Sequence, residues 1–191
     1  PTPDPDPEPT PTPDPGTIED ITDPSENTAS TDISDTPEEL AATMLTDEER
    51  EQLAEGANIS VWGESSDKDS TVSVKDQYLT EALLSEGTSV GKYLDINLYK
   101  KINDGNAQKV TEVPGGKVTI TLKVPDELIK EGRIFGVIRV HGNTATLLDS
   151  TYNATDHTLT FESDEFSTYA ITYKDTASDD SSDGTTPSGS D

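Results

Sequence analysis

A run of alternating residues, HTLTFESDEFSTYAITYKD at positions 157–175, constrains the fold more than any other feature. Leu159 and Phe161 alternate with polar residues in its first half, and aromatic or β-branched residues alternate in its second half. Alternation with a period of two in such residues is typical of half-buried β-strands. We therefore predict two strands joined by a tight connection. This pair should close a domain, because Asp, Ser, Thr and Gly dominate the chain after Lys174.

Further segments upstream have the same strand character. Residues 117–124 alternate cleanly between apolar residues and Lys or Thr, and residues 133–140 are apolar on both faces, which favours a central strand. Many short strands separated by turns are typical of a sandwich or barrel. We expect a mainly β fold, an Ig-like β-sandwich of about seven to eight strands. Other strands are predicted at 58–62, 90–102, 109–113 and 145–148, and connections at 63–70 and 150–156.

Helices are predicted where capping residues precede apolar positions. Asp35 or Thr36 caps the first helix, which begins at Pro37. Thr46 begins a capping box with Glu49 in the second. These two form an N-terminal helical segment. A crossover helix is predicted over residues 74–84, with Ser73 as its cap and Gly87 as its end.

Composition divides the chain into three parts. Residues 1–35 are acidic and rich in Pro, so we expect a disordered linker in this range. Residues 176–191 are mainly Asp, Ser, Thr, Gly and Pro, which indicates a disordered tail. Residues 36–175, about 140 positions, then form one β-sandwich module with minor helices, which is enough chain for a single core.

Charge and residue usage exclude several classes of function. The formal net charge of -26 repels nucleic acids and anionic lipid surfaces. The chain has no Cys, so disulfides, thiolate zinc sites and Cys nucleophiles are excluded. No apolar run reaches the length of about 18–20 residues that spans a bilayer. We expect a monomer without a cofactor.

The aromatic residues Trp62, Tyr93 and Tyr99 are the candidate ligand-binding residues. Trp62 ends a strand at a loop, and both tyrosines lie on the polar face of their strand. Exposed aromatic rings at these positions would bind the faces of sugars, which indicates polysaccharide or host glycan as a partner. Alternatively, these rings pack under loops or helices and have a structural role.

Other chemistry has weaker support in the sequence. No nucleophile elbow, HExxH motif or phosphate loop is present, and His141 and His157 are interpreted as turn histidines. The chain is therefore expected not to be an enzyme. A structural calcium ion is an option at the oxygen-rich loop of Asp67, Asp69 and Ser70, or between Asp149 and Asp156. A covalent isopeptide bond is a further option, with Lys101 and Asn97 as candidates by residue type alone.

Several runs resemble a known module. VGKYLDINLYKKI, KVTEVPGGKVTITLKVPDEL, RIFGVIRVHG and TLTFESDEFSTYAITYKD are similar to a β-rich module that recurs in secreted and cell-wall-attached multidomain proteins of gut Firmicutes. The resemblance covers about residues 38–175 and is most specific in FSTYA at 166–170 and YKD at 173–175. It implies an extracellular accessory or spacer domain, with no catalytic residues to assign.

These observations lead to one expected function and one alternative. We expect a non-catalytic accessory or spacer module of a secreted or wall-attached bacterial protein, whose partners are neighbouring domains of the same polypeptide. The alternative is a carbohydrate- or host-binding adhesin module. Exposure of Trp62, Tyr93 and Tyr99 would favour the alternative, and their burial would favour the spacer.

Overall fold

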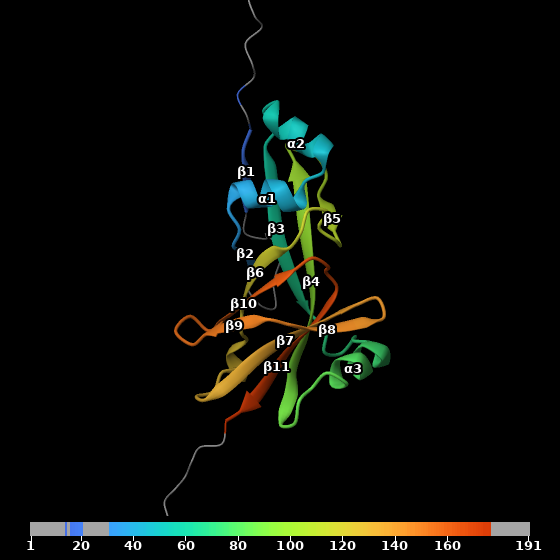
Figure 1. Cartoon of the computed structure of the whole chain (residues 1–191), viewed down its shortest axis with the longest axis vertical. Helices are drawn as coiled ribbons and strands as arrows, with labels where there is room; N and C mark the ends of the chain where they lie inside the picture. The colour runs from blue at the N-terminus through green and yellow to red at the C-terminus, as the bar shows by residue number, and fades with distance from the viewer. Residues whose placement is uncertain (1–13, 15, 21–30, 177–191) are drawn as a thin grey trace, which may run out of the picture.

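A computed structural model describes residues 14, 16–20 and 31–176 of the chain. Within these residues the fold is mainly β, with a seven-stranded and a four-stranded sheet packed against each other (Figure 1). The strands are β1 (Ile18–Asp20), β2 (Thr31–Ile33), β3 (Ile59–Asp67), β4 (Thr88–Ile102), β5 (Gln108–Val110), β6 (Val118–Lys123), β7 (Arg133–His141), β8 (Thr144–Leu148), β9 (Ser150–Asn153), β10 (Thr158–Ser163) and β11 (Thr168–Asp175).

The sheet topology confirms a β-sandwich. The seven-stranded sheet has the order β1-β3-β4-β11-β7-β8, and β5 also pairs with β4. The four-stranded sheet has the order β2-β6-β10-β9. The strand pairs are antiparallel except for β1 with β3, which is parallel. Two packed antiparallel sheets are the architecture expected of an Ig-like sandwich. The two sheets contain more strands than the predicted number of about seven to eight.

The helices begin at the predicted capping residues. Thr36 caps α1 (Pro37–Met44) in a full capping box with Glu39, and Thr46 caps α2 (Asp47–Ala54). Ser73 caps α3 (Val74–Glu81), which ends one turn before the expected Leu84. A single 3-10 turn covers Asp126–Leu128. The helix expected as a crossover, α3, connects the neighbouring strands β3 and β4 and packs on β7 and β8.

The long strand β4 determines the elongated shape of the molecule. Its residues 94–102 pair with β3, and its residues 88–95 pair with β11. The two halves of the seven-stranded sheet therefore follow one another along the long axis (Figure 1). As a result, β1 with the N-terminal helices lies near one end of the molecule, and the last residues of β11 lie near the other.

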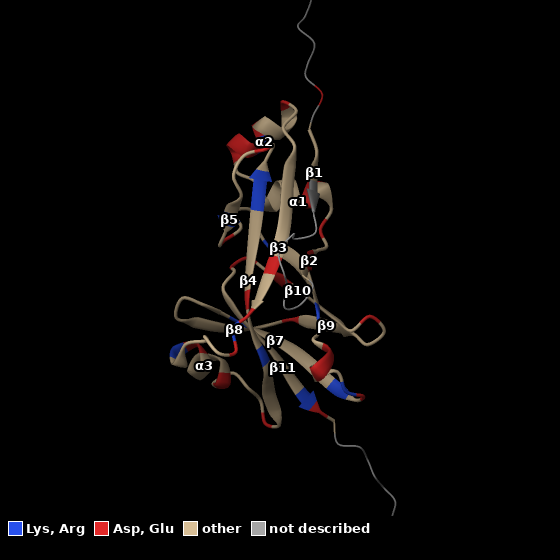
Figure 2. Ribbon diagram, turned by 180° about the vertical axis from the view of Figure 1, so that it is seen from behind, with Lys and Arg blue, Asp and Glu red and all other residues tan. Residues whose placement is uncertain are grey.

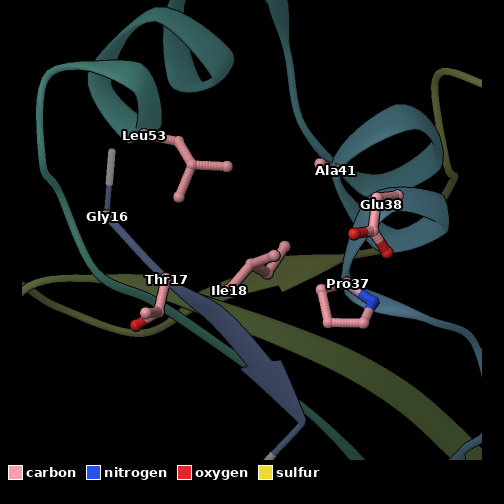
Figure 3. A pocket seen from close by; sticks show the side chains of 7 residues that line it. All are labelled: Gly16, Thr17, Ile18, Pro37, Glu38, Ala41 and Leu53. Atoms are coloured by element: carbon pink, nitrogen blue, oxygen red, sulfur yellow. The ribbon is translucent and has the colours of Figure 1, made fainter. Parts of the chain in front are cut away.

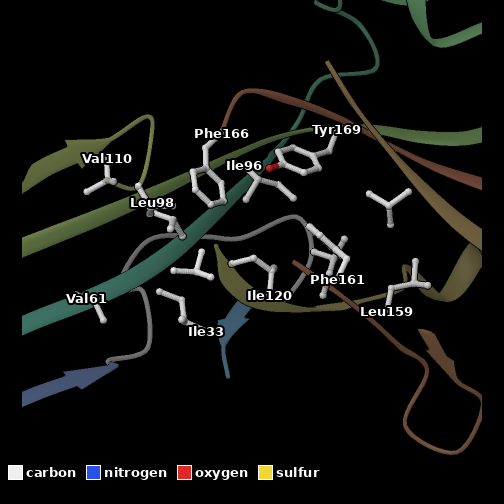
Figure 4. Packing of buried hydrophobic residues seen from close by; sticks show 14 of the residues in the cluster. Ile33, Val61, Ile96, Leu98, Val110, Ile120, Leu159, Phe161, Phe166 and Tyr169 are labelled. Carbon is white, nitrogen blue, oxygen red and sulfur yellow. The ribbon is translucent and has the colours of Figure 1, made fainter. Parts of the chain in front are cut away.

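The core lies between the two sheets and under α1. The alternating residues Leu94, Ile96 and Leu98 are fully buried, as their pattern predicts. Side chains from both sheets, among them Ile96, Ile120 and Phe161, meet in this layer (Figure 4). Each such side chain contributes about 1.5–3 kcal/mol through burial alone.

The two closing strands do not pair with each other. β10 pairs with β6 and β9 in the four-stranded sheet, whereas β11 pairs with β4 and β7 in the seven-stranded sheet. Residues 164–167 carry the chain from one sheet to the other. Alternation in the sequence indicates that a strand has one buried face, but it does not indicate with which other strand that strand pairs.

The apolar strand β7 lies inside its sheet but not at its centre. It is flanked by β11 and by the edge strand β8. Its residues are apolar on both faces because the second sheet covers Val137, while Ile138 is buried on the face on which α3 packs. The prediction that β7 is buried on both faces is therefore confirmed, and the prediction that it is the central strand of its sheet is wrong.

Besides the earlier end of α3, further expected boundaries differ from the structure, and the strand expected at 109–113 is the shorter β5, which ends at Val110. β3 continues to Asp67 through the predicted polar loop, because residues 63–67 pair with residues 94–98 of β4. β9 is a short strand where a connection was expected. β1 and β2 lie within the expected linker 1–35, so the folded part begins earlier than residue 36. The remaining expected tail residues, 1–13, 15, 21–30 and 177–191, lie outside the described residues.

The helices of the described chain are all short. None of them is long and apolar enough to cross a membrane.

Candidate functional site

Two of the three predicted aromatic residues form a stacked pair. Trp62 of β3 and Tyr99 of β4 are directly opposite in the register, with ring centroids 5.5 Å apart and an interplanar angle of 15°. Trp62 is only 9% exposed, and Tyr99 is half-buried. Stacking of this kind stabilises the pair of strands. The Trp62 ring therefore offers little surface to a sugar.

The third aromatic residue, Tyr93, lies elsewhere. It is half-buried, and its hydroxyl forms a hydrogen bond with Thr80 of α3. Burial raises the pKa of the Tyr93 hydroxyl above its ordinary value. Six residues along a strand separate Tyr93 from Tyr99, which is about 20 Å. The structure therefore brings Trp62 and Tyr99 together and leaves Tyr93 apart from them.

The side chain of Lys92 lies beside Asp67 and Asp69, in the first of the two places where the sequence suggests a calcium ion. The Lys92 ammonium lies 2.7 Å from a carboxylate oxygen of Asp67 and 3.1 Å from one of Asp69. The hydrogen bond from Lys92 holds the pKa of Asp67 below its ordinary value. Asp69 also accepts the backbone N–H of Tyr93 at 2.7 Å. These carboxylates thus already have a cation, and their geometry gives the calcium hypothesis no support.

At the second calcium position, the two carboxylates lie on either side of β9. Asp149 precedes the strand, and Asp156 follows it in the turn to β10. Asp156 accepts a hydrogen bond of 3.0 Å from the Asn153 side chain and so belongs to the turn.

The residues proposed for an isopeptide bond are too far apart to react. Asn97 and Lys101 lie on the same strand, β4, four residues apart, which corresponds to about 13 Å. Asn97 is buried and donates to the Asp95 carboxylate at 3.1 Å. This pair is therefore excluded by the backbone geometry of the strand.

Several hollows of ligand size occur in the described part, and two of them have a mainly apolar lining. One, of about 350 Å³, lies between β1 and the helices α1 and α2, and Ile18, Ala41 and Leu53 give it an apolar lining (Figure 3). The other, of about 610 Å³, is lined by Arg133 and Tyr152 among other residues. Small-molecule sites typically measure about 300–1,000 Å³.

Three polar side chains of the larger hollow, Arg133, Tyr152 and His157, are already bonded to other protein groups. Arg133 donates to both carboxylate oxygens of Asp175 at 2.7 and 3.1 Å, and its guanidinium lies 3.9 Å from the centre of the Tyr173 ring. The Tyr152 hydroxyl lies 3.0 Å from Nδ1 of His157. The hollow therefore has room for a ligand, but the side chains of Arg133, Tyr152 and His157 are engaged with other protein groups.

Arg139 organises a buried polar cluster at the connection between β10 and β11. Its guanidinium donates to the Ser163 hydroxyl at 2.9 Å and to the Asp164 carboxylate at 2.7 Å. The hydrogen bond from Arg139 lowers the pKa of Asp164. Tyr169 is fully buried beside them, and burial raises the pKa of its hydroxyl. The cluster fixes the connection that joins the two sheets.

A buried ion pair attaches α2 to the sheet. The Lys100 ammonium lies 2.6 Å from Oε1 of Glu49 and also donates to the Met44 carbonyl at 3.1 Å. Figure 2 shows basic residues at the end of β4 near the acidic helix α2. The second oxygen of Glu49 is buried and has no hydrogen-bond partner within the described chain. Lys100 therefore fastens α2 over the end of β4.

Comparison with known proteins adds no relative. No family model, curated protein or solved structure matches the chain.

Sequence reasoning missed the charged residues that organise these clusters. Lys92, Lys100 and Arg139 lie in strands predicted correctly, but their partners are distant in the sequence. One signal was present, since Arg139 and Lys100 interrupt otherwise apolar positions of their strands. A charge at a core-facing position indicates a buried partner.

Proposed function

We propose that the chain is a non-catalytic spacer or accessory module of a secreted or wall-attached bacterial protein. The observation that carries this proposal is the position of the chain ends. The described chain begins near one end of the long axis and leaves at the other end after β11 (Figure 1). A module connected in this way holds its neighbours apart by its whole length.

The pairing of β11 suits this role. β11 pairs along its full length with β7 and from Thr168 to Lys174 with β4. Hydrogen bonds between antiparallel strands lie perpendicular to the strand direction. A force along the long axis therefore acts on all of these pairs at once, in shear, instead of separating them one by one.

The charged clusters also support a structural role. The contacts of Arg133 and Lys100 join segments that are far apart in the sequence, Asp175 with β7 and α2 with β4. These side chains are used to fasten the fold. The predicted aromatic platform gives the adhesin alternative little support, because Trp62 is buried.

Force spectroscopy tests the spacer proposal. The chain has no Cys, so a pair of introduced cysteines defines the pulling direction. Asp14→Cys with Thr176→Cys loads the molecule along its length. Ser89→Cys with Thr176→Cys is the matched control, because Ser89 pairs with Tyr173 at the same end of the sheet. Pulling there unzips β11 from β4.

The expected result is a main rupture at a clearly higher force in the lengthwise direction than in the unzipping direction. Equal forces in both directions would contradict the mechanical argument. A pull-down of the whole chain on insoluble polysaccharides and mucin tests the adhesin alternative. Retention on one glycan that is lost in Tyr99→Ser would replace the spacer with a binding module.

A further inference from the structure

Three side chains of the types that ligate transition metals in proteins lie close together where two connections approach the end of β7. Glu112 follows β5, and Glu165 lies between β10 and β11; the two residues face each other in an isolated antiparallel bridge. The bridge is held by two backbone hydrogen bonds, from Val113 N–H to the Asp164 carbonyl at 3.0 Å and from Phe166 N–H to the Thr111 carbonyl at 2.9 Å. His141, the last residue of β7, completes the group.

The charges of this group are not balanced within the described chain. Like charges placed directly opposite each other in a β-bridge are destabilising. Arg139 contacts Glu165 at 3.2 Å but also contacts Asp164 at 2.7 Å, so one guanidinium serves two carboxylates. Among the described residues, the one charged partner of Glu112 within 4 Å is the His141 ring, with 3.6 Å between Oε1 and Nε2. A bound cation would compensate the remaining negative charge.

The chemistry of the donors selects the class of cation. Calcium and magnesium prefer sites made of oxygen ligands alone. One imidazole nitrogen with two carboxylate oxygens suits zinc and related divalent transition metals. One ligand atom from each of the three residues lies within 4.8 Å of the other two. Small side-chain rotations would therefore bring all three to bonding distance.

We propose that Glu112, His141 and Glu165 form a binding site for a divalent transition-metal ion, with Zn²⁺ as the favoured ion. Three protein ligands leave one coordination position for water. The ion connects three segments that are otherwise joined by the Glu112–Glu165 bridge and the Arg139 contacts. It thereby fixes the β10–β11 connection against the end of β7.

One feature limits the affinity of this site. Nδ1 of His141 is buried and has no hydrogen-bond partner in the described chain. Metal-bound histidines usually donate their second N–H to an acceptor, and loss of that acceptor weakens binding by about 10–100-fold. The site is therefore expected to bind Zn²⁺ more weakly than a closed structural zinc site.

Isothermal titration calorimetry, in which Zn²⁺ is added to the chelator-treated full chain, tests the proposal. The expected result is one saturable site per chain and a higher unfolding temperature with Zn²⁺. Glu112→Gln should weaken binding at least about tenfold. Glu112 is the preferred position because its side chain is exposed and its substitution leaves the contacts of Arg139 in place.

The matched control is Glu162→Gln, which removes the same charge from an exposed position on the neighbouring strand β10. It should leave Zn²⁺ affinity unchanged, and His141→Ala should abolish the saturable site. Equal affinities of Glu112→Gln, Glu162→Gln and the unmodified chain would overturn the proposal, since Zn²⁺ would then bind diffusely to the acidic surface. Displacement of Zn²⁺ by an equal concentration of Mg²⁺, or no saturable binding, would overturn it as well.

Discussion

Replacing Lys100 by Met tests how strongly the buried ion pair holds α2 on the sheet. The side chains of Lys100 and Glu49 are only 10% and 11% exposed, and 2.6 Å separates Nζ from Oε1. At an effective dielectric constant of about 20, unit charges at this distance attract each other by about 6 kcal/mol. The desolvation cost of the two ions offsets most of this attraction.

The single substitution should nevertheless be severe. Lys100→Met leaves the Glu49 carboxylate buried without its cation, and one of its oxygens already lacks a partner within the described residues. Breaking a buried pair on one side typically costs about 3–5 kcal/mol. The double variant Lys100→Met with Glu49→Leu removes both charges. It should recover most of the lost free energy of unfolding, because no uncompensated charge remains.

Urea denaturation followed through the fluorescence of Trp62, the single tryptophan, measures these free energies. Lys101→Met is the control, since Lys101 is the next residue of β4, points to the opposite face and is half-buried. It should change the free energy of unfolding by less than about 0.5 kcal/mol. The reasoning fails if Lys100→Met costs no more than Lys101→Met, or if the double variant is no more stable than Lys100→Met.

Three further perturbations probe the core, the buried cluster and the response to acid. Ile96→Ala, at a fully buried position, should cost about 2–5 kcal/mol in the same urea experiment. Tyr169→Phe should cost about 1–3 kcal/mol, because it removes two hydrogen bonds of a buried hydroxyl, which donates to the Glu165 carbonyl at 2.7 Å and lies 2.8 Å from the Ser163 hydroxyl. The pKa of Asp164 is lowered from 3.8 in the folded state by Arg139, so its stabilising effect is complete above pH 3.8 and is lost as the pH falls through the folded value. Unfolding midpoints measured from neutral pH downwards should therefore fall less steeply below that pH in Asp164→Asn than in the unmodified chain.

Local features of the fold were predictable, and distant pairings were not. The caps Thr36, Thr46 and Ser73 mark the true helix starts, because a cap acts on amides within three residues. The extension of β3 through Ser65 and Ser66 has no local signal. It exists because β4 is long enough to pair with it.

The candidate sites show the same limit. The sequence identified Trp62 and Tyr99 as notable, and the structure stacks them because the β3–β4 register places them opposite each other. From the sequence, His141 was interpreted as a turn histidine. Its proximity to Glu112 and Glu165 depends on a bridge between two connections, and no periodicity in the sequence encodes such a bridge.

The position of β11 has a consequence for synthesis of the protein. β11 is the last described strand, yet it lies between β4 and β7 in the sheet. On the ribosome, β4 and β7 therefore emerge earlier and wait with unpaired edges for residues 168–175. Exposed strand edges are prone to aggregation during folding. The seven-stranded sheet can therefore be completed only after β11 has emerged from the ribosome. A nascent chain stalled before residue 168 should remain protease-sensitive and depend on chaperones.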